Sequence, residues 1–359
     1  MTGTVRHIVK SSVLAWALLL VVGSMSAQPR ADYSRADSIA TQYAGAPLTN
    51  LWLLAHQLTD SLPTDTEKFR ALHTWVCQNI TNDHRIYERN KRMRLRYADD
   101  PARLQAWNAR LLPLVRQRLV DKRKTICTGY AYLLQNLASQ VGIRTEMIPG
   151  YGRSAAGNVG GPGWPDHHWN AVWLDSAWYL CDPTWSSGTQ HLWGQQGPDP
   201  YFLADPARFA LNHYPLDTAW LLLDHAPTLR QFLDAPLVYH AGQREEIVPL
   251  VPNAFWLTSP ANVPVVVQFQ AGTSPPADLE LYVVNQRGEV VTEKIMHPQP
   301  TEGGTYTIRH TFVARGTYLL HLRQQGQYLL TYEVKIGEQL PLAERDTQSP
   351  SAQANHPKP

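Results

Sequence analysis

The sequence has only three cysteines among its 359 residues, namely Cys77, Cys127 and Cys181. Three thiols cannot build the disulfide framework of a small secreted domain, and an odd number leaves at least one of them unpaired. One arrangement is a Cys77–Cys181 disulfide, which would leave Cys127 as the free thiol. The chain also lacks the paired Cys-x-x-Cys or His-x-x-x-His elements of a structural zinc site, so we predict no metal and no other cofactor.

The chain has little net charge, with 32 Lys and Arg against 30 Asp and Glu. A formal charge of +2 gives no general reason to expect nucleic acid or an anionic membrane as a partner. The exception is a cluster of Arg and Lys between residues 85 and 124. Such runs in helical hairpins are usually solvated faces, and no nucleic-acid-binding signature accompanies this one. We therefore predict no nucleic-acid partner. Compared with a nucleic acid, an acidic peptide or an envelope glycan is the better candidate for a substrate.

Long apolar runs are missing beyond the first 27 residues. Within that segment, Arg6 and Lys10 precede an apolar run at residues 13–22, which is short for a membrane span. The small residue Ala27 ends the segment. We interpret residues 1–27 as a signal peptide, and a retained membrane anchor is the alternative. The mature protein is therefore expected to be exported, to the periplasm or the extracellular space, without a stable membrane span.

The length of the chain predicts two domains, and the residue pattern changes near residue 240. We expect one domain at residues 28–240, with its core motifs at 120–186, followed by an immunoglobulin-like β-sandwich at 241–336 and a disordered tail at 337–359. The sandwich prediction depends on six short alternating patterns separated by turn residues, at 263–269, 279–285, 289–295, 306–312, 317–323 and 328–336.

The first domain combines helical patterns with later strand patterns. Thr64 and Glu67 match a capping box before an apolar stripe at helical spacing, and Asp175 and Ser176 join two alternating runs as a hairpin. Helices followed by antiparallel strands indicate an α+β fold. The predicted elements are helices at 65–80, 101–120 and 127–141 and strands at 143–149, 167–174 and 177–182.

Cys127 stands at the start of a predicted helix and not inside one. The positive end of the helix dipole and the free backbone N–H groups lower the pKa of a thiol in that position, which favours the thiolate. The backbone N–H of Cys127 is itself a candidate oxyanion donor, and Gly129 is expected to leave room for a substrate chain. The alternative is a small buried apolar cysteine.

Two adjacent histidines, His167 and His168, are candidates for a general base. If Asp175 and Ser176 form a two-residue turn, Trp169 lies opposite Asp182, and His167 lies diagonally from Asp182 on the same face of the hairpin. His168 then projects from the other face, together with Cys181. The hairpin geometry therefore selects His167, and His168 becomes a supporting or surface residue.

Asp182 is in the correct place to orient the imidazole of His167 and to stabilise its protonated form when Cys127 loses a proton. The alternative for Asp-Pro-Thr-Trp is a simple turn that ends a strand. A zinc site formed by Cys127, one of the two histidines and Cys181 is a competing interpretation. No Gly-x-Ser-x-Gly elbow supports a serine nucleophile instead.

Three short blocks of the chain resemble the transglutaminase-like superfamily, which shares a papain-like Cys-His-Asp arrangement. The superfamily carries a Cys-x-Gly-Tyr-Ala helix start, a His-x-Trp-Asn strand and an Asp-x-Thr-Trp strand end, and these blocks begin here at Cys127, His167 and Asp182. In the family the first residue of the histidine block is the base, in agreement with the hairpin argument. Residues 201–206 and 213–215 are more similar to the kyphoscoliosis-peptidase and cytokinesis-protein branch.

The resemblance implies a helix that bears the cysteine, packed on an antiparallel sheet that bears the histidine and the aspartate. It also implies thioester chemistry on peptide or glutamine-type amide bonds, as in a peptidase, deamidase or transamidase, with a protein or peptide substrate that can belong to the cell envelope. Trp169, Asn170 and Trp185 are expected to shape the site. The alternative is a catalytically silent envelope adaptor that uses the same fold and the β-sandwich as a binding module.

Overall fold

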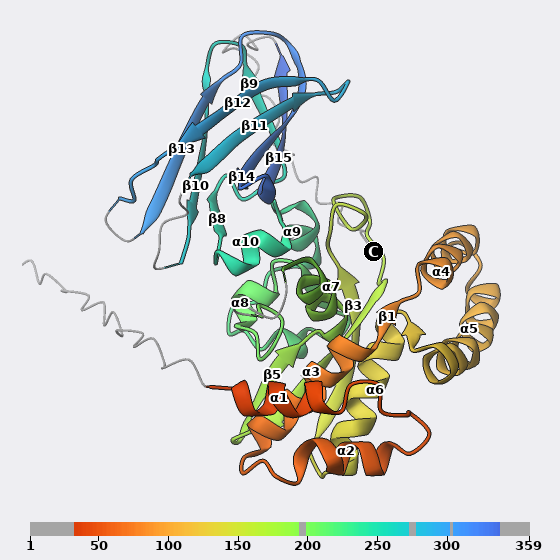
Figure 1. Ribbon diagram of the computed structural model, residues 1–359. Helices are drawn as coiled ribbons and strands as arrows, with labels where there is room; N and C mark the ends of the chain where they lie inside the picture. Colours follow the sequence, from red (N-terminus) through yellow and green to blue (C-terminus); the bar gives the residue numbers. More distant parts are fainter. Residues whose placement is uncertain (1–31, 194–198, 273–277, 302–303, 338–359) are drawn as a thin grey trace, which may run out of the picture.

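The computed structural model describes residues 32–193, 199–272, 278–301 and 304–337 (Figure 1). The predicted signal peptide at 1–27 lies outside these ranges, as does the predicted tail apart from its first residue. No helix within the described ranges is both long and apolar enough to cross a membrane.

A four-stranded antiparallel sheet forms the centre of the N-terminal region, with the strand order β5-β4-β3-β6. Helices α3 and α6 pack together over it, and their apolar stripes share one core with Val172 and Leu174 of β4. The predicted combination of helices and antiparallel strands is confirmed. The elements are α1 (Ser34–Gln42), α2 (Leu51–Thr59), α3 (Asp65–Asn79), α6 (Cys127–Gln140), β3 (Thr145–Gly152), β4 (His167–Leu174), β5 (Ala177–Cys181) and β6 (His213–Pro215).

The helix predicted at 65–80 is α3, and its capping box is confirmed. The Thr64 hydroxyl oxygen accepts a hydrogen bond from the backbone N–H of Glu67, at 3.2 Å. Trp75 and Cys77 are fully buried on this helix, because its apolar stripe faces the core. Helix α3 therefore has its start determined by local polar contacts and its orientation determined by packing.

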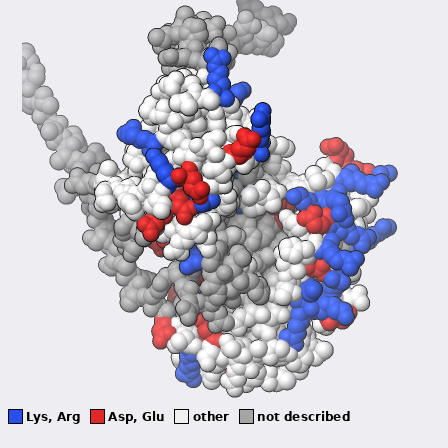
Figure 2. Space-filling model, turned by 45° about the horizontal axis from the view of Figure 1, so that its top comes forward, with Lys and Arg blue, Asp and Glu red and all other residues white. Residues whose placement is uncertain are grey.

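Helices α4 (His84–Arg96) and α5 (Pro101–Lys122) form a hairpin that projects beside the sheet (Figure 1). Strands β1 (Thr81–Asn82) and β2 (Lys124–Thr125) pair in parallel and hold the two ends of this hairpin together. Figure 2 shows Lys and Arg side chains gathered over the hairpin. Because β2 ends two residues before Cys127, the base of the hairpin lies directly beside the start of α6.

Short elements connect β5 to the C-terminal strands. The alternative of a simple turn at Asp-Pro-Thr-Trp is wrong, because Pro183 is the first residue of a helix and its fixed φ is suited to that position. The connecting elements are α7 (Pro183–Trp193), α8 (Pro206–Phe209), the 3-10 helix η1 (Thr218–Leu221), α9 (Leu229–Asp234), β7 (Leu237–Val238) and α10 (His240–Arg244).

The C-terminal strands form two sheets around a shared apolar core. One sheet has the order β13-β10-β8, and the other has the order β12-β11-β14-β15-β7 with β9 alongside β15. All six strands predicted from alternation are present within one residue of the predicted bounds. The strands are β8 (Val248–Val251), β9 (Trp256–Pro260), β10 (Pro264–Gln270), β11 (Leu279–Asn285), β12 (Val290–Met296), β13 (Thr305–Thr311), β14 (Gly316–Gln324) and β15 (Gln327–Gly337).

Strands β7, β8 and β9 were not among the predicted ones. Strand β7 has only two residues, too few for an alternation pattern, and its place is decided by pairing with Leu330 and Thr331 of β15. Strand β9 pairs with β15 in parallel, in a sheet whose other pairs are antiparallel. The chain therefore enters the C-terminal sheet at β7, slightly before the predicted boundary at residue 240.

Candidate active site

Cys127 is the first residue of α6, as the sequence predicts. The preceding residue, Ile126, caps the helix with an extended backbone (φ −113°, ψ 178°) and offers no side-chain oxygen to the first turn. The sulfur is half-buried, and in its protonated form it donates to the backbone carbonyl oxygen of Asp166, at 3.8 Å. This placement exposes the sulfur to the positive end of the helix.

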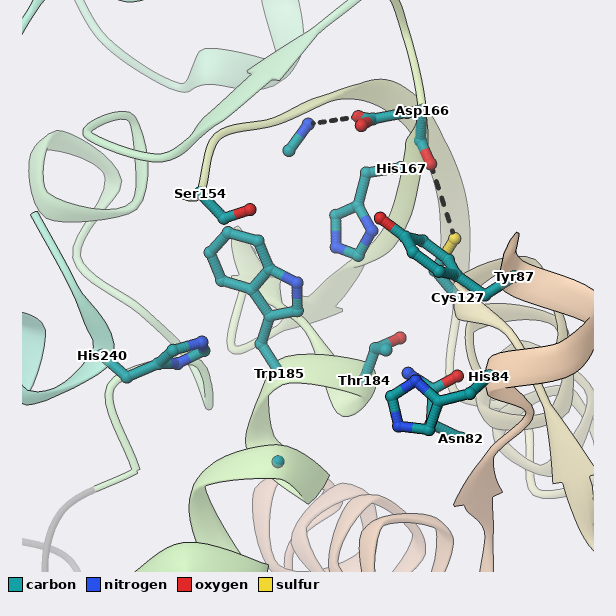
Figure 3. Close-up of a pocket in the computed structure, with 12 residues that line it drawn as sticks. Asn82, His84, Tyr87, Cys127, Ser154, Asp166, His167, Thr184, Trp185 and His240 are labelled. Carbon is teal, nitrogen blue, oxygen red and sulfur yellow. Dashed lines mark hydrogen bonds between the residues drawn. The ribbon is translucent and has the colours of Figure 1, made fainter. Parts of the chain in front are cut away.

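A cavity of about 310 Å³ opens over the Cys127 sulfur. Figure 3 shows that Tyr87 and His167 lie beside this sulfur, with Trp185 further along the pocket. The sequence argument found Cys127, His167 and Trp185 but missed most of the wall, because residues from the start of α4 approach only in the folded chain. The lining residues are Asn82, His84, Tyr87, Cys127, Gly152, Ser154, Asp166, His167, Thr184, Trp185, Gly188 and His240.

The hairpin register and the predicted approach of His167 to Asp182 are confirmed. Leu174 pairs with Ala177 and Asn170 pairs with Cys181, as a two-residue turn requires. His167 Nε2 lies 2.6 Å from Asp182 Oδ2, so Nδ1 is the ring nitrogen left for the thiol. His168 lies on the other face, where its Nδ1 is 3.3 Å from the Thr128 hydroxyl.

Asp182 uses its two carboxylate oxygens for different purposes. Oδ1 accepts hydrogen bonds from the backbone N–H groups of Thr184 (2.8 Å) and Trp185 (3.1 Å), and so caps the start of α7. Oδ2 accepts from His167 and from a second imidazole, that of His213, at 3.0 Å. The fully buried carboxylate is therefore held in one orientation by four donors.

His213 is the main residue of the site that the sequence argument left without a role. It lies on β6, is fully buried and stacks on Phe209 with ring centroids 3.8 Å apart. Its Nδ1 is 2.9 Å from the Asn212 side chain. Burial lowers the pKa of His213 to about 4, although Asp182 partly offsets this, so the neutral ring donates from Nε2.

The titration behaviour of the site follows from these contacts. Burial alone raises the pKa of the Cys127 thiol, but hydrogen bonds with His167 and His168 outweigh it and bring the pKa down to about 6. Burial alone lowers the pKa of His167, but the Asp182 carboxylate raises it well above its usual value. At neutral pH the pair is therefore a thiolate and an imidazolium.

The pKa of the Asp182 carboxyl group is lower than its usual value. Burial alone raises this pKa, but the positive charge of His167 and its hydrogen bond have a larger, opposite effect, and His213 adds to that effect. The carboxylate therefore stays ionised opposite the imidazolium.

Of the three residues expected to shape the site, Trp185 lies in the pocket wall, whereas Trp169 and Asn170 are buried away from it. The Trp185 ring lies 5.3 Å from the His167 ring between centroids. Trp169 is buried behind that ring, at 6.1 Å. Asn170 is fully buried and donates to the backbone carbonyl of Ala131 at 3.0 Å, so it joins β4 to α6.

The role expected for Gly129 is wrong. Gly129 is buried and does not line the pocket. A Cβ at this position would lie 1.8 Å from the Thr125 hydroxyl oxygen. The missing side chain therefore accommodates the end of β2 against α6, and it does not leave room for a substrate chain.

The remaining two cysteines do not join the site. All three cysteines are free, so the alternative of a Cys77–Cys181 disulfide is wrong. Burial raises the pKa values of the Cys77 and Cys181 thiols well above their usual range. Cys181 packs in the helical core, on the face of the hairpin opposite to His167. In this position Cys181 is not arranged to share a zinc ion with Cys127 and His167.

His167, Asp182 and His213 have ligand atoms within 4.8 Å of one another, a spacing that can hold a metal ion. In this structure the contacts are hydrogen bonds of 2.6 and 3.0 Å to a single carboxylate oxygen. A metal ion would take the two Nε2 atoms that now orient the carboxylate. We therefore interpret the three residues as a hydrogen-bonded array.

We expect His213→Phe to lower kcat/KM about tenfold, because the ring stacking is kept while a charge-assisted hydrogen bond to Asp182 is lost. The pKa of Asp182 in the folded protein then moves back toward about 3.9, its unfolded value. The depressed pKa stabilises the fold above that pH, so the variant should be less stable at neutral pH, and the difference should shrink as the pH falls below about 4.

Thermal unfolding between pH 3 and 7, together with steady-state kinetics, measures these effects. His321→Phe is the matched control, because His321 is a buried histidine that also makes a side-chain hydrogen bond, to the Thr331 hydroxyl at 2.7 Å, without contacting Asp182. Equal kinetics and equal pH dependence of stability in both variants would refute the role of His213.

Comparison with known proteins agrees with this geometry. Residues 53–183 match the model of the transglutaminase-like superfamily. Human kyphoscoliosis peptidase is 30% identical over 218 residues, covering 59% of this chain and 30% of that protein. Hillarin of Drosophila melanogaster is 28% identical over 227 residues, covering 58% of this chain and 25% of that protein. The chain thus spans less than a third of the length of these relatives.

The predicted resemblance is therefore confirmed for the N-terminal region, which contains a transglutaminase-like domain. Among solved structures, the filamin domain of Lin-41 aligns with 26% of this chain and 95% of that domain, at 15% identity and a TM-score of 0.21. That score is too low to assign a fold.

Proposed function

We propose that this transglutaminase-like domain is an active cysteine enzyme that acts on peptide or glutamine-type amide bonds. One observation carries the proposal: the thiol of Cys127 and the imidazole of His167 meet at an open pocket, while Asp182 holds the far nitrogen of that imidazole at 2.6 Å. An adaptor that only binds has no need of this charged, hydrogen-bonded arrangement.

The chemistry follows from the positions of these groups. The Cys127 thiolate attacks the carbonyl carbon, and the backbone N–H groups at the start of α6 stabilise the oxyanion. Protonated His167 gives its proton to the leaving nitrogen, the C–N bond breaks, and a thioester forms on Cys127. His167 then takes a proton from water or from a second amine, which attacks the thioester and restores the thiolate.

The choice between hydrolysis and transfer belongs to the second half of this reaction. Kyphoscoliosis peptidase carries a peptidase name, and the cavity of about 310 Å³ admits water as well as a side chain. We propose hydrolysis of an amide as the basic activity, with transfer to an amine when one is bound. We also propose export of the protein, on the basis of the sequence of residues 1–27.

The pH dependence of Cys127 alkylation tests the ion pair directly. Thiolate forms above the pKa of the thiol, so the rate of reaction with iodoacetamide should rise with a midpoint near pH 6, because the pKa of Cys127 is lowered to about 6. A free thiol has its midpoint near about 8.5, which the urea-unfolded protein should show. Mass spectrometry of the labelled peptides identifies the residue that reacts.

Cys77 and Cys181 serve as internal controls in the same experiment, since both are fully buried and should stay unlabelled while the protein is folded. A midpoint near that of the unfolded protein would contradict the ion pair. That result would favour the catalytically silent adaptor.

A further inference from the structure

Positive charge is concentrated in one segment of this nearly neutral chain. Between residues 83 and 124 lie thirteen of the 32 Lys and Arg residues but only five of the 30 Asp and Glu residues. The rest of the chain is therefore acidic on balance. The segment corresponds to the α4–α5 hairpin, and its cations form the large blue area on the right of Figure 2.

A groove of about 620 Å³ lies between α4 and α5. Four arginines line it against a single glutamate, so the groove is strongly cationic. None of its lining residues is Phe, Tyr or Trp. The lining residues are His84, Arg85, Ile86, Glu88, Arg89, Arg92, Leu114 and Arg118.

The arginines of the groove differ in the partners that their guanidinium groups have within the protein. Arg118 forms an ion pair with the buried Asp83. Arg89 lies over the ring of Trp107, at 5.3 Å from its centroid. Arg85 and Arg92 are exposed, and neither has an ion pair or a side-chain hydrogen bond within the described part of the chain. These two guanidinium groups are available to an anionic ligand.

The groove adjoins the pocket of Cys127. His84 lines both of them, and α4 continues along the other side of the thiol, where Lys91 and Arg94 line a second small cavity together with Cys127. Lys91 donates to the Ala156 carbonyl at 3.2 Å, and Arg94 donates to the Pro165 carbonyl at 2.6 Å. These bonds join α4 to the segment before His167, so the groove has a defined position relative to the thiol.

We propose that the groove between α4 and α5 binds an acidic stretch of the polypeptide substrate, next to the amide that reaches Cys127. This inference rests on the proposed amide chemistry and adds the class of substrate. Carboxylates of Asp and Glu match arginine guanidinium groups in charge and in bidentate geometry. A nucleic acid would also be attracted by charge, but the groove lacks the aromatic rings on which bases stack.

Peptide binding to the Cys127→Ala protein tests the proposal without turnover. The probes are two fluorescein-labelled dodecapeptides, each with one central Gln, flanked by Glu in one and by Ser in the other. We expect the Glu peptide to bind more tightly by on the order of tenfold at low salt, since several exposed ion pairs between Glu and the arginines each contribute a modest amount. The difference should disappear near ~0.5 M salt, where charges are screened within a few ångström.

Reversal of the two unpaired arginines, Arg85→Glu with Arg92→Glu, should remove the preference for the Glu peptide. Arg287→Glu with Arg309→Glu is the matched control, because both arginines are exposed on the C-terminal strand region and the two substitutions change the net charge by the same amount as the double reversal. Circular dichroism should show the same fold in both variants. The control should keep the full preference.

Equal binding of the two peptides, or a preference that survives the double reversal, would overturn the proposal. So would tighter binding of a twelve-residue oligothymidine than of the Glu peptide, which would assign the groove to nucleic acid. The binding experiment needs no catalysis. Absence of turnover by the unaltered protein would therefore contradict the proposed enzyme activity and leave this result intact.

Discussion

We expect Cys127→Ala to lower the rate of amide hydrolysis and transfer to background, a loss on the order of 10⁴-fold or more, because the covalent intermediate can no longer form. The Cys127 thiol lines the pocket, and its pKa, lowered to about 6, favours the nucleophilic thiolate at neutral pH. The measurement is product release from a peptide amide, with trapping of the acyl-enzyme by mass spectrometry.

Cys77→Ala is the matched control for this experiment. Cys77 is fully buried on α3, so its substitution removes a thiol of equal size without touching the pocket, and activity should be kept. Thermal unfolding of both variants shows whether the fold survives. Turnover by a folded Cys127→Ala protein above background would refute the assignment of the nucleophile.

The second large effect is expected for Asp182→Asn, with kcat lower by about 10³–10⁴-fold. The amide keeps the shape of the carboxylate and an oxygen that can still cap α7, where Oδ1 now accepts from Thr184 and Trp185. Its NH₂ group would instead donate to His167 Nε2. The imidazole proton then moves to Nδ1, so His167 faces the thiol with a proton and cannot accept one.

This variant should also move the midpoint of Cys127 alkylation from about pH 6 back toward that of a free thiol, because the imidazolium loses its counter-charge. Asp199→Asn is the matched control, since Asp199 accepts hydrogen bonds from the Ser186 hydroxyl and the Tyr201 N–H without contacting His167. An unchanged alkylation profile in Asp182→Asn would contradict the role of the carboxylate.

Much of the local structure could be predicted because it depends on short-range patterns. Helix α3 begins at a capping box, and the strands β10 to β15 alternate strictly enough to be found within one residue. The two-residue turn at Asp175 and Ser176 also determines the register of β4 and β5. From that register alone, His167 and not His168 faces Asp182.

Other features depend on contacts between distant parts of the chain. His213 reaches Asp182 across 31 residues, through the pairing of β6 with β3, and no sequence spacing indicates this. The reason for glycine at position 129 could not be predicted either. A side chain there would collide with Thr125, and this contact appears only in the folded chain. The start of helix α7 at Pro183 was not predicted, because an Asp-Pro pair is equally typical of a strand end and of a helix start.

The sequence by itself predicted Cys127, His167 and Asp182 as the candidate nucleophile, base and orienting carboxylate, and it determined the face of the hairpin on which His167 and Asp182 meet. Those conclusions needed only helix ends, strand parity and the chemistry of three side chains. The tertiary structure alone decided that Asp182 is shared by two imidazoles and that a cationic groove runs beside the thiol. Both depend on long-range packing, of β6 against β3 and of α4 against the loop before His167, which local periodicity does not encode.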